Sequence, residues 1–251
     1  MKEIVYGSPP GSLGDMVTLL PLVDATKFTF VTYPWNMRCD LLKENAHNII
    51  IDGNFPDEVE TINKYGNMEV NNQNKTIHTV YRFLKTYGVY FEDSNLIPSL
   101  KFTAKEKRES DRFRNSFNKP PFAFSIQDAR LYSPLSNEEW EILFGILAEK
   151  YTLIQVSRDK PSLSVPFFDL SHFSNIRDTA TILRCCDGFI GTDSGLMHLA
   201  VACDTYSFCI HEEMGTIKFD NYAYIPDMWK DKECKAFYFP PGKIPVDYLM
   251  K

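Results

Sequence analysis

Residues 187–202 read DGFIGTDSGLMHLAVA, and this stretch decides the class of fold. The apolar run over 188–191 predicts a short strand, and the apolar stretch over 196–203 predicts a helix. In an open sheet of parallel strands, ligands bind at the carboxyl ends of the strands, where a strand-to-helix turn of this kind lies. The stretch therefore predicts an α/β fold with a ligand at this turn.

The polar turn within this stretch has residue types that can hold phosphate. The first N–H groups of a helix have no acceptor inside the helix, and the helix dipole makes this end positive. Gly195 lacks the Cβ that would keep a phosphate away, and His198 can donate a hydrogen bond from the first turn. Simple capping of the helix by Asp193 or Ser194 explains the same residues about as well. The candidate phosphate-binding residues are Thr192, Asp193, Ser194, Gly195 and His198.

Strand and helix patterns alternate along the rest of the chain, which favours parallel βαβ units. The strands are expected at 1–6, 28–32, 48–51, 122–126, 151–156, 188–191 and 205–210. The helices are expected at 16–27, 35–46, 76–87, 103–117, 137–150, 176–186 and 196–203. The sequence NKPP at 118–121 breaks the pattern and predicts a boundary between an N-terminal domain, 1–118, and a C-terminal domain, 119–251. Ser136 and Glu139 predict a capping box at the start of the helix over 137–150.

A second strand-to-helix turn, GSLGD, follows the first expected strand. Gly11, Ser12, Leu13 and Gly14 would form a loop that lies close to a ligand, and Asp15 could accept a proton from a substrate hydroxyl. N-capping by Asp15 is the structural alternative. The loop lacks the G-x-G-x-x-G spacing of a Rossmann fingerprint and the Gly-Lys-Ser/Thr of a P-loop.

The composition limits the class of protein. The 251 residues carry a formal net charge of −6, which disfavours a nonspecific nucleic-acid binder. No apolar run has the length of a transmembrane helix, and the N-terminus does not resemble a signal peptide, so a cytoplasmic protein is expected. The six cysteines are then expected to be reduced, and to serve as small core residues.

Taken together, the two turns resemble the signatures of a known family. GSLGDMVTLLPLVDA is similar to the N-terminal signature of glycosyltransferase family 9, the ADP-heptose lipopolysaccharide heptosyltransferases, and DGFIGTDSGLMHLAVA is similar to their C-terminal signature. The resemblance implies a compact GT-B fold, in which two Rossmann-like domains face each other across a cleft. It also explains Pro21, which interrupts an expected helix.

The resemblance further implies an inverting sugar transfer without a metal ion or cofactor. The donor would be a nucleotide-diphosphate sugar, most often ADP-linked, that carries a heptose or another hexose-like sugar. The acceptor would be a saccharide or glycolipid, with no nucleic-acid partner, no transmembrane segment and room for peripheral membrane contact. Asp15 would be the general base, and the turn at Ser194, Gly195 and His198 would hold the donor diphosphate and stabilise the leaving group.

The sequence also departs from the family pattern. The Lys or Arg expected after the first strand of the C-terminal domain has only Arg130 as a counterpart, with Gln127 nearby. Arg158 and Lys160 stand where a Gly-Gly-x-x-Glu stretch is expected, and a solvated turn explains them better than phosphate contact. Gln127, Arg130, Arg158 and His211 remain candidate donor contacts.

Two alternative functions fit the same residues. A sugar-nucleotide hydrolase or epimerase could use the same fold and would need no acceptor. A non-catalytic nucleotide-sugar-binding protein fits the short N-terminal half, while Asp15 in its Gly-rich loop argues against it.

Overall fold

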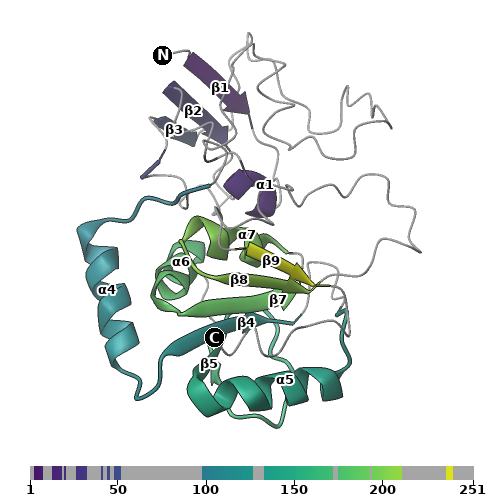
Figure 1. The fold of residues 1–251 in the computed structure, drawn as a ribbon. Coiled ribbons are helices and arrows are strands. Elements are labelled where there is room, and N and C mark those ends of the chain that lie inside the picture. The colour runs from purple at the N-terminus through teal and green to yellow at the C-terminus, as the bar shows by residue number, and fades with distance from the viewer. Residues whose placement is uncertain are drawn as a thin grey trace, which may run out of the picture.

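The computed structural model has two parallel sheets, one in each half of the chain (Figure 1). It describes residues 3–7, 13–18, 20, 27–32, 41, 44–45, 48–51, 98–126, 133–171, 175–192, 194–210 and 236–239. The N-terminal sheet has the order β1-β2-β3, and the C-terminal sheet has the order β6-β5-β4-β7-β8-β9. Every strand pair is parallel, so the predicted α/β class with parallel sheets is confirmed.

The N-terminal sheet carries one described helix, α1, after its first strand. In chain order, these elements are β1 (Glu3–Gly7), α1 (Leu13–Thr18), β2 (Lys27–Thr32) and β3 (Asn48–Ile51). In the register, Tyr6 lies beside Phe30 and Phe30 lies beside Ile49. α1 is the next described element after the carboxyl end of β1.

The C-terminal sheet has six strands. They are β4 (Pro121–Ser125), β5 (Thr152–Gln155), β6 (Phe168–Asp169), β7 (Gly188–Thr192), β8 (Ser207–Ile210) and β9 (Ala236–Phe239). The chain first moves outward from β4 to β5 and β6, then returns to β7 on the other side of β4. This is the strand order 3-2-1-4-5-6 of a doubly wound nucleotide-binding domain, and it creates a switch point between β4 and β7.

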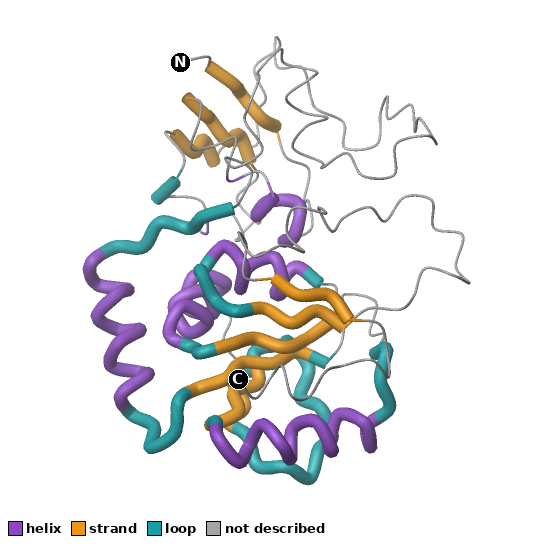
Figure 2. The backbone as a smooth tube through the Cα atoms, in the orientation of Figure 1, coloured by secondary structure: helices purple, strands orange, loops and turns teal. Residues whose placement is uncertain are grey.

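Helices cover both faces of this sheet (Figure 2). They are α4 (Ala104–Asn115), α5 (Asn137–Lys150), α6 (Ile176–Cys185) and α7 (Gly195–Ala202). One apolar cluster joins α6 and α7 to the sheet through Phe189 and Met197, and the other joins α5 through Phe124 and Trp140. The predicted capping box is confirmed, because Ser136 Oγ accepts from the N–H of Glu139 and the Glu139 carboxylate accepts from the N–H of Ser136.

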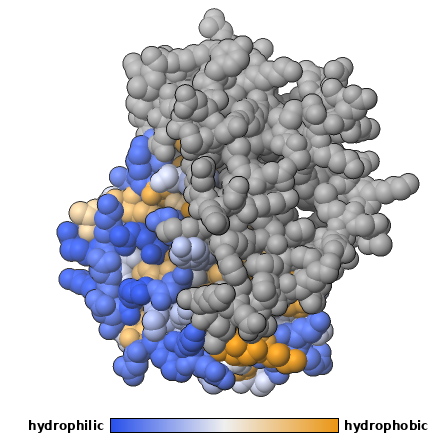
Figure 3. Space-filling view, in the orientation of Figure 1, coloured by the Kyte–Doolittle hydropathy of each residue, from blue (hydrophilic) through white to orange (hydrophobic). Residues whose placement is uncertain are grey.

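The helix α4 lies beside α6, at the edge of the C-terminal half (Figure 1). Figure 3 shows a largely hydrophilic surface on this side of the molecule. The helix sequence AKEKRESDRFRN carries charges of both signs, which is typical of a solvated face. Thr103 and Glu106 form a second capping box that the sequence analysis overlooked. Residues 98–103 form the linker that leads from the N-terminal half into α4.

Two expected helices differ in the structure, and two strands were not predicted. The first helix begins at Leu13 rather than at residue 16, and Glu44 and Asn45 lie in a turn rather than in a helix over 35–46. β6 was not expected, and β9 lies in a segment for which no regular structure was predicted. The helix expected over 76–87 lies outside the described residues.

Candidate functional site

The switch point between β4 and β7 lies at the turn that joins β7 to α7. Gly191 on β7 lies beside Ser125 on β4 in the strand register, and both strands end within one residue of this pair. In open α/β sheets, ligands bind in the crevice outside the carboxyl ends of the two strands at such a point. The topology therefore places the turn at 192–195 at the expected ligand crevice of the C-terminal half.

The hydroxyl groups of this turn are buried and are not used to cap α7. Ser194 is the N-cap residue of α7, but its side chain makes no capping hydrogen bond. Within the described part of the chain, neither Ser194 Oγ nor Thr192 Oγ1 has a hydrogen-bond partner, although both atoms are buried. Because an unpaired buried hydroxyl is unfavourable, these two groups are candidates to bind a ligand. The capping interpretation does not explain the side chain of Ser194.

Two glycines bring the first turns of α1 and α7 into direct contact. A Cβ on Gly195 would lie 2.7 Å from Leu13 Cβ and 3.0 Å from Gly14 N. A Cβ on Gly14 would lie 2.9 Å from Cδ2 of His198, whose side chain is 5% exposed. Any larger residue at either position would push the helices apart, so the contact depends on both glycines.

This contact brings together parts of the two sequence signatures. Leu13 and Gly14 come from the N-terminal turn, and Gly195 and His198 come from the C-terminal turn. Asp15 is the third residue of α1, so its backbone lies next to this contact. The side chain of Asp15 lies outside the described residues, as do Gly11, Ser12, Gln127, Arg130, Asp193 and His211.

After β5, Val156 and Ser157 are buried, and the chain reaches the surface at 158–160. Arg158 is exposed in a turn, and Lys160 forms an ion pair with Asp169 at 3.3 Å. This exposure fits the solvated turn that the sequence analysis favoured. The backbone hydrogen bond from Ser171 and the contact with Lys160 hold the pKa of Asp169 below its ordinary value.

Gln155, which was not predicted from the sequence, supports this turn from the end of β5. Its side chain is fully buried and donates from Nε2 to the carbonyl oxygens of Ser157 and Asp159, both at 2.9 Å. Because both acceptors are carbonyl oxygens, the orientation of the amide group is fixed. Within the described residues, Gln155 Oε1 has no hydrogen-bond partner. A glutamine that ends an apolar strand, as in TLIQ, was the available sequence signal.

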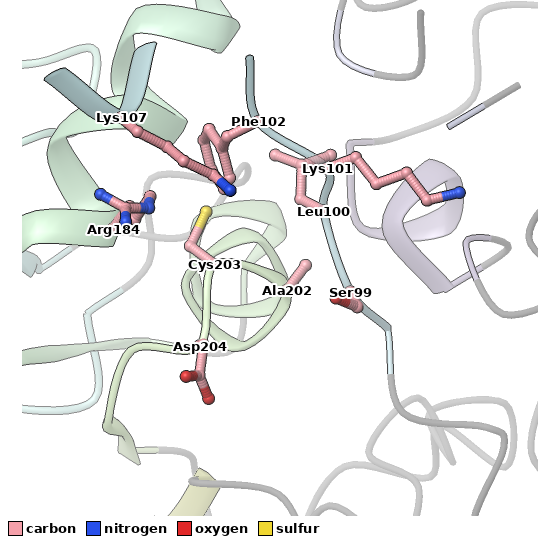
Figure 4. A pocket seen from close by; sticks show the side chains of 9 residues that line it. All are labelled: Ser99, Leu100, Lys101, Phe102, Lys107, Arg184, Ala202, Cys203 and Asp204. Atoms are coloured by element: carbon pink, nitrogen blue, oxygen red, sulfur yellow. The ribbon is translucent and has the colours of Figure 1, made fainter. Parts of the chain in front are cut away.

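An open cavity of about 370 Å³ lies at the opposite end of α7 (Figure 4). Its walls come from the linker, α4, α6 and the end of α7, and include Phe102, Lys107, Arg184 and Asp204. Within the described residues, no group of three or more His, Cys, Asp or Glu side chains could hold a metal ion. None of the helices in the described segments has the length and apolarity to cross a membrane.

Four of the six cysteines lie among the described residues, and all four are free and buried: Cys185, Cys186, Cys203 and Cys209. This confirms the predicted core role for these four. Burial raises the pKa of the Cys203 thiol well above its ordinary value, so this thiol is not poised to act as a nucleophile.

Two parallel sheets, with a strand-to-helix turn of each half at their contact, are the architecture of a GT-B fold. The model of glycosyltransferase family 9 (heptosyltransferase) matches residues 129–215, so this part of the chain is similar to that family. The predicted resemblance is confirmed, and so is the prediction of a heptosyltransferase-like glycosyltransferase. No curated protein sequence matches the chain significantly.

Solved structures confirm the predicted GT-B fold. A family 9 glycosyl transferase from Veillonella parvula has a TM-score of 0.67 at 14% identity, over 95% of this chain and 87% of that one. The ADP-heptose lps heptosyltransferase II of E. coli has a TM-score of 0.64 at 13% identity, over 95% of this chain and 90% of that enzyme. TibC, a dodecameric iron-containing heptosyltransferase in complex with ADP-D-beta-D-heptose, has a TM-score of 0.56 at 14% identity, over 84% of this chain and 58% of TibC.

Proposed function

We propose that this protein transfers a sugar from a nucleotide-diphosphate donor to an acceptor hydroxyl group. In the proposed reaction, the Asp15 carboxylate takes the proton of the acceptor hydroxyl. The oxygen of that hydroxyl attacks the anomeric carbon of the donor sugar at the same time. The bond from that carbon to the β-phosphate oxygen breaks, the configuration inverts, and the nucleoside diphosphate leaves with the bonding electrons. The first N–H groups of α7 and the hydroxyl of Ser194 donate hydrogen bonds that stabilise the negative charge on the leaving diphosphate.

One observation carries this proposal: the first turns of α1 and α7 touch through Gly14 and Gly195. The turn before α7 has the features of a phosphate site, including buried hydroxyl groups that the protein itself leaves unpaired in its described part. The contact puts the backbone of Asp15 beside that turn. A candidate base whose backbone adjoins the leaving-group site fits a transfer reaction better than simple nucleotide storage.

The donor, acceptor and domain division are the finer parts of the proposal. We infer an ADP-linked heptose or a similar sugar, because ADP-heptose is named for heptosyltransferase II and for TibC. The acceptor would be a saccharide or glycolipid, and the reaction would need no metal ion and take place in the cytoplasm. The halves are proposed to divide at 118/119, with α4 at the end of the N-terminal segment but packed on α6.

The decisive experiment replaces Asp15 by Asn. Transfer from ADP-heptose to a glycolipid extract should fall by about 100-fold or more, which is the contribution of a general base. The affinity for ADP, measured by calorimetry, should remain within about threefold, because the diphosphate contacts α7. Glu44→Gln removes an exposed carboxylate of the same half and serves as the matched control.

The remaining outcomes separate the alternatives. Intact turnover in Asp15→Asn would remove the assigned role of this residue. Release of free sugar without an acceptor would identify a hydrolase, and tight ADP binding without any turnover would identify a binding protein. Loss of turnover with EDTA, restored by a metal ion, would overturn the metal-free mechanism.

A further inference from the structure

The buried side chain of Arg177 connects three separate segments of the chain. Arg177 is the second residue of α6 and is 3% exposed. Its Nη1 donates to the carbonyl oxygen of Leu41 in the N-terminal half at 2.8 Å. Its Nη2 donates to the carbonyl oxygen of Lys101 in the linker and to Glu106 Oε2 on α4, the latter at 2.9 Å. Its Nε donates to Glu106 Oε1 at 2.5 Å.

The linker is also bonded to both halves through its backbone. The side chain of Asn45 donates to the carbonyl oxygen of Ser99 and accepts from the N–H of Lys101, both at 3.0 Å. The N–H of Leu100 donates to the carbonyl oxygen of Ala202, the last residue of α7, at 2.8 Å. The helix α7 therefore contacts α1 at its first residue and is bonded to the linker at its last.

Stability alone is a weak reason for a charged group at the position of Arg177. A cation in the first turn of a helix opposes the helix dipole. A buried ion pair also tends to contribute less to stability than an apolar side chain of similar volume. A planar guanidinium can, however, hold several acceptors in one fixed geometry, which neither an apolar residue nor a lysine does. The side chain is suited to fixing the relative position of the segments that it joins.

We propose that Arg177 is a positioning residue that fixes the angle between the two halves. By holding Leu41, the linker and α4 in one arrangement, it keeps the first turn of α1 seated against Gly195 and His198. The expected effect of Arg177 on catalysis rests on the proposed function. The fixed angle itself is a property of the protein that can be tested without any substrate.

The test compares Arg177→Met with Arg184→Met. Arg184 lies about two turns further along the same helix. Both guanidinium groups lie near the ring of Phe102, that of Arg177 at 5.1 Å and that of Arg184 at 5.8 Å from the ring centre. Arg184 also bonds to Asp111 on α4 at 3.5 Å, and among the described residues before 98 it has no hydrogen-bond or ion-pair partner. Figure 4 shows Arg184 beside Phe102 at the wall of the open cavity. The control thus removes a cation and an aromatic contact but leaves the connection between the halves.

The first measurement is hydrogen exchange of the linker amides. In Arg177→Met, the amides of Leu100 and Lys101 should exchange at least tenfold faster, because the linker loses the hydrogen bond from Arg177 to the carbonyl oxygen of Lys101. In Arg184→Met, and in α5 of both variants, exchange should match the wild type. Unchanged linker exchange in a folded Arg177→Met would overturn the proposal. Where Arg177→Met does not fold, Arg177→Lys keeps the charge, loses the planar geometry and should show the same change to a smaller extent.

The second measurement separates positioning from general damage. In Arg177→Met, kcat for sugar transfer should fall tenfold or more while the affinity for ADP stays within twofold, and Arg184→Met should change neither. A parallel loss of ADP binding, or an unchanged kcat despite faster linker exchange, would overturn the catalytic consequence. If the wild-type protein transfers no sugar, the proposed function fails, and linker exchange still decides whether Arg177 fixes the angle.

Discussion

The replacement of Gly195 by Ala tests whether the contact between α1 and α7 is needed for catalysis. The added methyl group would point at α1, 2.7 Å from Leu13 Cβ. Carbon atoms in ordinary contact are about 3.5–4.0 Å apart, so the two helices would have to separate by about 1 Å. Overpacking of this kind costs about 1–3 kcal/mol of stability. A misplacement of about 1 Å between catalytic groups can lower a rate about 100-fold.

We therefore expect kcat of Gly195→Ala to fall about 100-fold. The affinity for ADP should change by less than about fivefold, because the methyl group faces Leu13 rather than the phosphate side of the turn. The melting temperature should fall by about 2–4 °C for each kcal/mol of lost stability. Steady-state kinetics, calorimetry with ADP and thermal unfolding measure these three effects separately.

Gly145→Ala is the matched control for this substitution. Gly145 lies on the exposed side of α5, and a Cβ there would meet nothing within 4 Å. Alanine in the middle of a helix should raise stability by about 0.5–1 kcal/mol and leave kcat unchanged. If Gly195→Ala retained wild-type kcat and wild-type stability, the reasoning that links the Gly14–Gly195 contact to catalysis would be refuted.

Two further predictions concern stability. The hydrogen bonds from Arg177, and those from Thr103, lower the pKa of Glu106 from its ordinary value of 4.5 to about 2, against the opposing effect of burial. The stabilisation from this carboxylate is therefore present above about pH 4.5 and is lost as the pH falls towards 2. Glu106→Gln should cost about 3 kcal/mol near neutral pH, as expected for a broken buried ion pair, and urea unfolding should show this difference shrinking as the pH falls from about 4.5 towards 2. A difference that stayed constant with pH would contradict the assignment. Ser136→Ala should cost about 1 kcal/mol because α5 loses its capping box, whereas Ser136→Thr should retain most of that stability in the same unfolding assay.

The sequence predicted most of the C-terminal sheet because its signals are local. The central strands β4 and β7 are continuous apolar runs, and Ser136 and Glu139 lie three residues apart in the pattern of a capping box. The turn at 192–195 was identified for the same reason: a strand, a glycine and a helix follow one another directly. Each of these features depends on neighbours within a few residues.

The features that the sequence did not reveal depend on distant partners. β9 is a short aromatic run, and only its parallel pairing with β8 makes it a strand. Arg177 and Glu106 are 71 positions apart, and each looks like an ordinary surface charge in its own helix. The contact between the two signatures could be expected from the family resemblance, but the atoms that touch, such as Gly14 and His198, follow from the packing of the two halves.

The paired glycines at 14 and 195 also limit how the two halves can be recombined. Each glycine lies in a different half, and the space that one leaves open is filled by the backbone or side chains around the other. A chimera that joined either half to the complementary half of a related enzyme would keep this geometry only if the new half also carried a small residue at the facing position. Swapping halves to exchange acceptor or donor specificity therefore requires small residues at these two positions. This steric requirement is separate from the residues that contact the substrates.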